Sequence, residues 1–280
     1  MKNFDNIKII SCDLDGTLLG PNGEPSDLTK EVINKLHEKK YILIANTGRP
    51  LYSIPNEVVN LPFDYLVGMN GQIILDTKAN KIYEKEKLNK SDLINLSDLG
   101  NKNMAIGHLH YENVIYLIMS KRNFIFGYIF NQLNKLRFIF KQIERTKVKY
   151  VTDIKSLKLN DIAKICFASF GKNLIKLQEE INLLENKPYQ TFLVTENWLE
   201  VMAADISKGN ALIEIAKKEN IDIKNTLAIG DGENDIPMLK VAGISVAMEN
   251  AMDNTKKVAD YIAPSFREDG LAKFFTKHLL

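Results

Sequence analysis

The chain has 280 residues, of which 45% are hydrophobic, 26% charged and 9% aromatic. This composition is typical of a globular protein and argues against a disordered, collagen-like or coiled-coil chain. The 37 basic and 35 acidic residues give a formal net charge of +2, which does not support a dedicated nucleic-acid-binding protein, because such proteins usually carry a strong basic excess.

Neither a membrane segment nor a leader is predicted. The longest apolar run, 114–119, is far shorter than the roughly 20 residues that a membrane-spanning helix needs. The N-terminus carries an acid, Asp5, and continues directly into a short apolar stretch, without the pattern of a signal peptide. We therefore expect a soluble cytoplasmic protein with no membrane partner and no nucleic-acid partner.

Buried strands are predicted at four short apolar runs, each of which ends in a polar or glycine-rich cluster. The runs are 7–12, 41–45, 65–67 and 226–229, and the clusters are 13–17, 46–49, 68–71 and 230–235. Such runs are typical of strands buried on both faces of a parallel sheet. Helices are predicted between them, after the N-cap residue Ser26 and after Lys208. This alternation favours a doubly wound α/β core whose polar clusters gather at the carboxyl ends of the strands.

The middle of the chain, residues 84–203, has a different pattern. It contains apolar strands at 114–119 and 164–170, and a helix is predicted from one apolar face that carries Ile125, Ile129, Leu133, Leu136 and Phe140. No acidic loop follows these strands. We interpret 84–203 as an α+β domain inserted into a core that consists of 1–83 and 204–280.

Two carboxylates, Asp13 and Asp15, follow the first predicted strand. Their side chains share a face if the strand continues through them. Paired carboxylates suit a hard cation such as Mg²⁺, and they also suit a division between a nucleophile and a general acid–base. Gly16 would let backbone N–H groups approach a bound phosphate, and Thr17 adds a hydroxyl. Taken alone, these residues are equally compatible with an Asp-Gly turn.

A second oxygen-rich loop, with Asp231, Asn234 and Asp235, follows the last of the four runs. By itself this loop is compatible with a turn and a helix cap. Two such loops, each placed directly after a buried strand, are much harder to explain as turns. Because the carboxyl ends of parallel strands meet at one edge of a sheet, the two loops together predict a shared site.

Four motifs, in chain order, resemble those of the haloacid dehalogenase superfamily. They are Asp13-Leu14-Asp15-Gly16-Thr17-Leu18, Thr47-Gly48-Arg49, Lys208-Gly209 and Gly230-Asp231-Gly232-Glu233-Asn234-Asp235. Their order, with a large segment inserted after the third core strand, is similar to that of the Cof-type (subfamily IIB) phosphatases. Asn70-Gly71, 247–251 and 268–270 resemble further landmarks of that group, whereas Glu249 and Arg267 depart from its pattern. The resemblance implies a catalytic core with an inserted α+β cap.

The resemblance also implies a role for each motif. Asp13 would attack phosphorus and form an aspartyl-phosphate, and Asp15 would protonate the leaving oxygen and then activate water. Mg²⁺ would be held by Asp13, Asp15 through its backbone carbonyl, Asp231 and Asp235. The residues that would bind the substrate phosphate are Thr47, Lys208, Gly16, Gly48 and Asn234. The implied activity is Mg²⁺-dependent hydrolysis of small phosphorylated metabolites, with the cap selecting the substrate.

Two other functions stay open at the level of sequence. The same motifs permit a phosphomutase of the related capped branch, which would retain phosphate and need a bisphosphate activator. They also permit a non-catalytic regulator that binds a phosphometabolite. The presence of all four of Asp13, Asp15, Lys208 and Asp231 argues against a regulator, because a site that has lost its catalytic function need not keep them. The sequence indicates no oligomeric state.

Several residues have both a functional and a structural interpretation. Arg49 would contact substrate or pair with an acid, and Asn70 would line the site or form a turn. His108 and His110 would share a strand face, but without a third ligand a plain exposed strand is favoured over a metal site. Packing is expected for Cys12, and a domain core is favoured over a nucleotide-stacking surface for the aromatic residues between 124 and 140.

Overall fold

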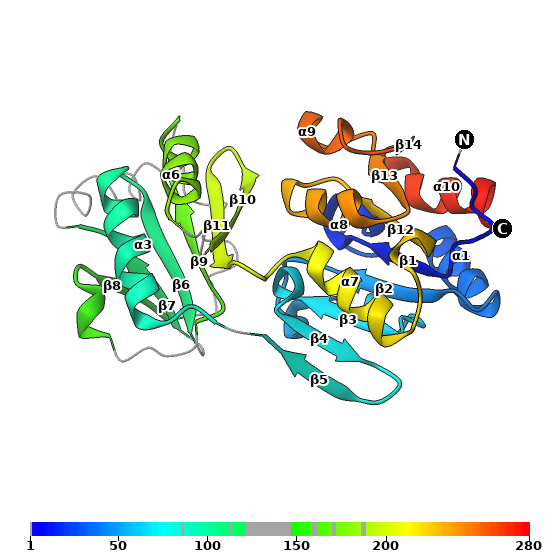
Figure 1. The fold of residues 1–280 in the computed structure, drawn as a ribbon, viewed down its shortest axis with the longest axis horizontal. Coiled ribbons are helices and arrows are strands. Elements are labelled where there is room, and N and C mark those ends of the chain that lie inside the picture. Colours follow the sequence, from blue (N-terminus) through cyan, green and yellow to red (C-terminus); the bar gives the residue numbers. More distant parts are fainter. Residues whose placement is uncertain are drawn as a thin grey trace. The chain divides into compact units, whose positions relative to one another are not determined.

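The computed structural model describes residues 2–85, 87–111, 114–120, 147–157, 162–169, 172–185 and 189–280. The chain forms two compact units, each with a sheet of its own (Figure 1). The core unit comprises Met1–Lys85 and Ile206–Leu280, and the inserted unit comprises Glu86–Asp205. Among the described helices, none combines the length and the apolar character that crossing a membrane requires.

The core unit is built on an eight-stranded sheet in the order β14-β13-β12-β1-β2-β3-β4-β5. Six neighbouring strands run parallel: β14 (Tyr261–Ala263), β13 (Ile244–Met248), β12 (Thr226–Gly230), β1 (Ile9–Cys12), β2 (Ile42–Asn46) and β3 (Tyr65–Gly68). β4 (Ile73–Asp76) and β5 (Lys81–Glu84) add an antiparallel hairpin beyond β3. The predicted parallel α/β sheet is therefore confirmed, and the hairpin is an addition that the four apolar runs did not indicate.

Helices cover both faces of this sheet (Figure 1). α1 (Asp27–Glu38) and α10 (Gly270–His278) pack on one face, and α7 (Lys208–Lys218) and α8 (Ile236–Val241) pack on the other. Because side chains alternate along a strand, Ile10 of β1 belongs to the first core and its neighbour Ile9 to the second. The core unit is thus doubly wound, as predicted.

Shorter segments complete the core unit. They are α2 (Asn56–Val59), α9 (Asp253–Lys256) and the turns η1 (Leu14–Leu18), η2 (Leu51–Ser53), η3 (Met69–Gly71), η5 (Ile223–Asn225), η6 (Glu233–Asp235) and η7 (Phe266–Glu268). Of these, η1, η3 and η6 directly follow β1, β3 and the end of β12. They therefore shape the edge of the sheet at which the polar clusters lie.

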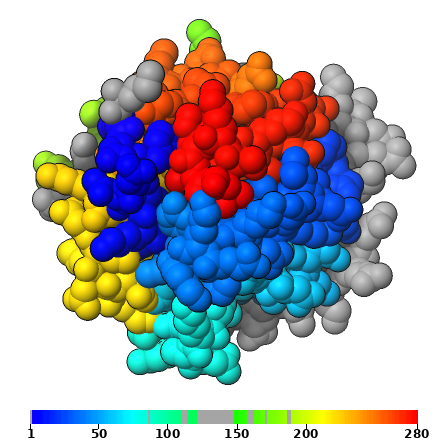
Figure 2. All heavy atoms as spheres, turned by 90° about the vertical axis from the view of Figure 1, so that its right-hand side faces the viewer, coloured from blue at the N-terminus to red at the C-terminus, as the bar shows by residue number. Residues whose placement is uncertain are grey.

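The N-terminal residues pack against the C-terminal helix. Figure 2 shows the first residues of the chain beside α10 on one face of the core unit. Phe4 stacks on His278 with ring centroids 4.8 Å apart, and Lys2 Nζ lies 2.6 Å from the Asp260 carboxylate. Lys39, the residue after α1, donates through Nζ to the carbonyl of Leu280 at 2.9 Å. Both ends of the described chain are thus bound into the core unit.

The inserted unit is a six-stranded sheet in the order β10-β11-β9-β6-β7-β8. Its strands are β6 (Ile106–Tyr111), β7 (Val114–Ile118), β8 (Lys147–Val151), β9 (Lys164–Ala168), β10 (Tyr189–Thr195) and β11 (Trp198–Ala203), and its helical segments are α3 (Lys90–Lys102), α6 (Asn173–Asn182) and η4 (Ile154–Ser156). α3 and α6 bury their apolar sides against one face of this sheet. The α+β character predicted for this region is confirmed, whereas the helix predicted from Ile125 to Phe140 and its aromatic residues lie outside the described residues.

Candidate active site

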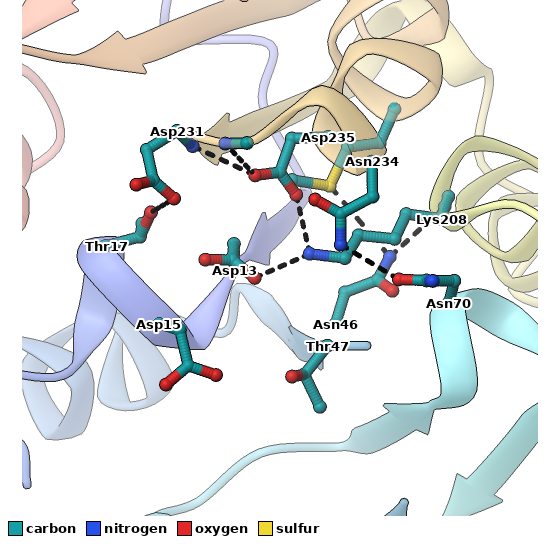
Figure 3. Close-up of polar contacts among 12 residues, drawn as sticks. Asp13, Asp15, Thr17, Asn46, Thr47, Asn70, Lys208, Asp231, Asn234 and Asp235 are labelled. Carbon is teal, nitrogen blue, oxygen red and sulfur yellow. Dashed lines mark hydrogen bonds and ion pairs between the residues drawn. The ribbon is translucent and has the colours of Figure 1, made fainter. Parts of the chain in front are cut away.

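Side chains from four segments of the core unit meet at the carboxyl ends of its central strands (Figure 3). Asp13 follows β1, Thr47 follows β2, Asp231 and Asp235 follow β12, and Lys208 begins α7. β1 lies between β12 and β2 in the sheet. The topology therefore brings together the two acidic loops that the sequence places far apart.

A buried lysine joins the two loops. Lys208 Nζ lies 2.5 Å from Asp13 Oδ1 and 2.6 Å from Asp235 Oδ1, and its side chain is fully buried. Ser207 caps the N-terminus of α7 by accepting from the backbone N–H of Asn210, which fixes the start of the helix that carries Lys208. Two carboxylates thus share one ammonium group that water does not reach.

The charges of this cluster shift its ionisation. Burial alone would lower the pKa of Lys208, but the carboxylates of Asp13 and Asp235 outweigh it and raise that pKa above its usual value. Burial and the charge of Asp235 raise the pKa of Asp13 well above its usual value, although Lys208 acts in the opposite sense. The same two causes raise the pKa of Asp231 to about 7. The cluster contains three carboxylates and one ammonium, so a second cation would reduce its excess of negative charge.

The donor set fits a hard divalent cation. Asp13, Asp231 and Asp235 each offer a carboxylate oxygen, and these oxygens all lie within 4.8 Å of one another. Oxygen ligands without His or Cys are those that Mg²⁺ prefers. Asp235 already accepts at both oxygens, from Lys208 at Oδ1 and from the backbone N–H groups of Asp231 and Gly232, each at 2.9 Å, at Oδ2. Asp235 is therefore placed to orient the cluster.

The turn after β1 separates the two aspartates of the first motif. β1 ends at Cys12, and the backbone turns through Gly16 at φ +78°. The strand does not continue through Asp13 and Asp15, so the condition for their sharing a face is not met. Asp13 is buried, whereas the Asp15 side chain is 57% exposed and points away from Asp13 (Figure 3). Arg49 binds the Asp15 carboxylate in a bidentate manner, through Nε at 2.7 Å and a terminal nitrogen at 2.5 Å. Of its two interpretations, pairing with an acid is the one seen for Arg49.

Gly16 and Thr17 contact the second acidic loop. A Cβ atom on Gly16 would lie 2.3 Å from Asp231 Oδ2, so this position accepts only glycine without a shift of the carboxylate. Thr17 donates its hydroxyl to Asp231 Oδ1 at 3.4 Å. The first motif thus shapes the position of Asp231 directly.

Thr47, Gly48, Asn70 and Asn234 form the other wall of the site. Thr47 is buried and accepts through its hydroxyl oxygen from the Arg49 N–H at 3.1 Å. Asn234 donates to Asn70 Oδ1 at 2.9 Å, and both lie within 3.5 Å of the place that a Cβ on Gly48 would occupy. Asn70 has a left-handed backbone at φ +55°, so it serves as a turn residue as well as lining the site.

Sequence reasoning missed two asparagines. Asn46, the last residue of β2, is fully buried and donates through Nδ2 to the backbone carbonyl of Lys208 at 3.1 Å. Asn250, which the sequence marks only as part of a family landmark, donates to Asp231 Oδ2 at 3.2 Å. A polar residue at the end of an otherwise apolar strand was the available signal for Asn46, whereas the contact of Asn250 depends on strand order alone.

Cys12 and His108 lie outside the acidic cluster. The expectation of an exposed strand is wrong for His108, because its side chain is buried against Trp198, with ring centroids 5.0 Å apart. His108 belongs to no cluster of possible metal ligands among the described residues. The side chain of His110 lies outside the described set. Cys12 is fully buried, and burial raises its pKa above the usual thiol value, so it is packing as expected.

Known proteins are similar to this chain along its whole length. The family model of haloacid dehalogenase-like hydrolases matches residues 10–275. From Bacillus subtilis, 5-amino-6-(5-phospho-D-ribitylamino)uracil phosphatase YcsE is 29% identical and covers 96% of this chain and 94% of its own. Phosphatase YwpJ from the same organism is 26% identical and covers 98% and 100%.

Solved structures share the fold. A haloacid dehalogenase-like hydrolase from B. subtilis has a TM-score of 0.77 at 25% identity and covers 98% of this chain and 100% of that one. The subclass IIB sugar phosphatase BT4131 has a TM-score of 0.76 at 21% identity, with coverage of 96% and 98%. The chain therefore belongs to the haloacid dehalogenase-like hydrolases, as its four motifs predicted, and within them to the Cof-type phosphatases.

Proposed function

We propose that the chain is a Mg²⁺-dependent phosphatase that hydrolyses small phosphorylated metabolites through an aspartyl-phosphate on Asp13. The observation that carries the proposal is the buried ammonium of Lys208 between the carboxylates of Asp13 and Asp235. A phosphate dianion that approaches an isolated carboxylate is repelled. A fixed positive charge beside the attacking oxygen offsets this repulsion, and such charge compensation is the main requirement of phosphoryl transfer.

Asp13 is the proposed nucleophile. Its carboxylate oxygen forms a bond to phosphorus as the bond from phosphorus to the leaving oxygen breaks, and water later attacks phosphorus to release inorganic phosphate and restore the carboxylate. Lys208 and the hydroxyl of Thr47 bind the phosphoryl oxygens. The backbone N–H groups at Gly16 and Gly48 are proposed to contact the phosphoryl group, together with the side-chain amide of Asn234, which donates to Asn70.

Asp15 is the proposed general acid and base. It gives a proton to the leaving oxygen in the first step and takes one from the attacking water in the second. Its carboxylate is exposed and bound by Arg49, so it must leave this pair, or turn with it, to reach the leaving oxygen.

Mg²⁺ is the proposed cofactor. Asp13, Asp231 and the backbone carbonyl of Asp15 would hold it, and Asp235 would orient the other carboxylates. When bound, the cation would neutralise negative charge on the transferring phosphoryl group. The chain's own contribution is an acidic cluster in which burial, followed by the charge of Asp235, raises the pKa values of Asp13 and Asp231.

The proposed substrates are phosphomonoesters of sugars, sugar alcohols or similar metabolites. The support comes from YcsE, whose name describes a phosphatase of a phosphoribityl compound, and which matches nearly the whole chain. We assign the proposed catalytic core to 1–83 and 204–280, and the proposed substrate-selecting role to the inserted domain, 84–203. The proposed location is the cytoplasm.

A phosphate-release screen tests this function. The purified protein is incubated with Mg²⁺ and a panel of sugar phosphates, sugar-alcohol phosphates, nucleotides, flavin mononucleotide and pyridoxal phosphate, with Asp13→Asn as the matched control. We expect release with a subset of the panel, loss of release in chelator with recovery on Mg²⁺ addition, and none with Asp13→Asn. Absence of turnover across the panel would overturn the proposal, as would isomerisation of a sugar phosphate without release.

A further inference from the structure

The loop after β13 reaches across the site to the two acidic loops. The order β14-β13-β12-β1 places the carboxyl ends of four parallel strands side by side. Asn250, two residues after β13, is exposed at the protein surface and lies in the loop between β13 and α9. Its side-chain amide contacts the loops that follow each of the other three strands.

The amide of Asn250 uses both kinds of hydrogen-bonding atom. Nδ2 donates to the backbone carbonyl of Gly16 at 2.9 Å and to Asp231 Oδ2 at 3.2 Å, and Oδ1 accepts from the Phe266 N–H at 3.1 Å. An Asn side chain has two N–H donors and one carbonyl acceptor. Each of these groups therefore has a partner, and each partner belongs to a different loop.

The Asp231 carboxylate is consequently held at both oxygens. Thr17 donates to Oδ1 at 3.4 Å and Asn250 donates to Oδ2. The backbone of the same residue is also tied to the loop after β13, because the Met252 N–H donates to the Asp231 carbonyl at 3.0 Å. The buried Thr255 adds a bond from its hydroxyl to the Gly232 carbonyl at 2.9 Å.

We propose that Asn250 is a positioning residue for the cation site, which fixes the Asp231 carboxylate and the Gly16 turn in the geometry that receives Mg²⁺. The proposal rests on the function proposed above. Carboxylates that bind metals are commonly held by hydrogen bonds from a second layer of residues, and loss of such a partner typically weakens metal affinity or activity about 10–100-fold. Here, one amide orients both Asp231 and the turn beside it, and the two pack so closely that a Cβ on Gly16 would lie 2.3 Å from the carboxylate.

Asn250→Ala removes all three bonds without adding a charge. We expect the dissociation constant for Mg²⁺, measured by calorimetric titration of the metal alone into chelator-stripped protein, to rise about 10–100-fold. The Mg²⁺ concentration that gives half-maximal phosphate release should rise by a similar factor, with kcat at saturating Mg²⁺ much less affected. The matched control is Asn34→Ala, because Asn34 is an exposed residue of α1 whose amide also donates to a backbone carbonyl, that of Lys30 at 2.8 Å.

Thermal unfolding separates positioning from general stability. Mg²⁺ binding raises the thermal midpoint by an amount that grows as its concentration exceeds the dissociation constant, so the Mg²⁺-induced rise should shrink in Asn250→Ala and not in Asn34→Ala. If the alanine variant does not fold, Asn250→Ser, whose hydroxyl is too short to reach both partners, should show the same loss. Unchanged Mg²⁺ affinity in a folded variant would overturn the inference and leave the phosphatase proposal intact. A wild-type protein that binds no Mg²⁺ would overturn both.

Discussion

Replacing Lys208 with methionine is the sharpest test of the charge balance in the site. Methionine fills a similar volume but removes the ammonium that lies within 2.6 Å of the carboxylates of Asp13 and Asp235. The Lys208 side chain is fully buried, so water cannot take its place. The variant therefore leaves two buried carboxylates, and Asp231 beside them, without their shared positive charge.

The expected loss of stability is large. Breaking a buried ion pair by removing one partner typically costs about 3–5 kcal/mol, and one ammonium serves two pairs here. The cluster can reduce the cost by taking up protons, since its carboxyl pKa values are already raised with Lys208 present. The folded variant then binds more protons than the unfolded chain, so its free energy of unfolding should fall as the pH rises. We expect a loss of about 3–5 kcal/mol at pH 8 and a smaller loss at pH 6.

Urea unfolding in the presence of a chelator measures this loss. Lys35→Met is the matched control, because Lys35 pairs with Glu31 at 2.6 Å on the exposed side of α1, and such pairs contribute about 0.5 kcal/mol or less. Added Mg²⁺ should restore part of the stability of Lys208→Met, since it supplies positive charge to the same carboxylates. A loss below about 1 kcal/mol at pH 8, or one equal to that of the control, would refute the charge-balance argument.

Four further predictions concern single residues. Asp13→Asn should reduce phosphate release to background while the protein stays folded, which release assays and thermal midpoints together will show. Asp15→Asn should slow single-turnover formation of the phospho-enzyme about 10²–10⁴-fold with an alkyl phosphate as substrate. The rate with p-nitrophenyl phosphate should fall far less, because its leaving group needs no proton. Equal losses with the two substrates would exclude Asp15 as the general acid. Gly16→Ala, at φ +78° and 2.3 Å from Asp231 Oδ2, should weaken Mg²⁺ binding in calorimetric titration; unchanged affinity would contradict the close packing. Burial would raise the pKa of Asp260, but hydrogen bonds from Lys2 and Ser245 outweigh it and lower that pKa, so Asp260→Asn should cost about 1 kcal/mol in urea unfolding at pH 7. This difference should shrink as the pH falls from about 4, where the unfolded chain takes up the proton, through the lowered pKa of the folded protein.

The sequence predicted the parts of the fold that rest on local patterns. The apolar runs that became β1, β2, β3 and β12 are strongly apolar and end in glycine or polar residues, so both their type and their ends could be read directly. The hairpin of β4 and β5 was not predicted, and β5 in particular is largely exposed, which leaves it little apolar pattern. β13 and β14 were likewise not singled out as strands.

The candidate site likewise has features that could be predicted from the sequence and features that could not. Asp13 and Asp231 could be brought together by reasoning, since both follow buried strands and such ends converge in a parallel sheet. The direction of the Asp15 side chain could not, because it depends on the turn that begins at Leu14 and on the position of Arg49. The contacts of Asn250 require the order of four strands, and that order results from packing of the whole sheet and not from any local pattern.

The strand order also dictates when the active site can exist during synthesis. β1 is made early, but its neighbour β12 begins at Thr226, after the whole inserted unit. The inserted unit is one continuous segment that can fold as it leaves the ribosome. In the core unit, one edge of β1 stays unpaired until β12 has been synthesised. Nascent chains are therefore expected to need protection from aggregation at that edge. A chain that stops before Thr226 contains Asp13 but not Asp231, so an incompletely synthesised chain is expected to have no phosphatase activity.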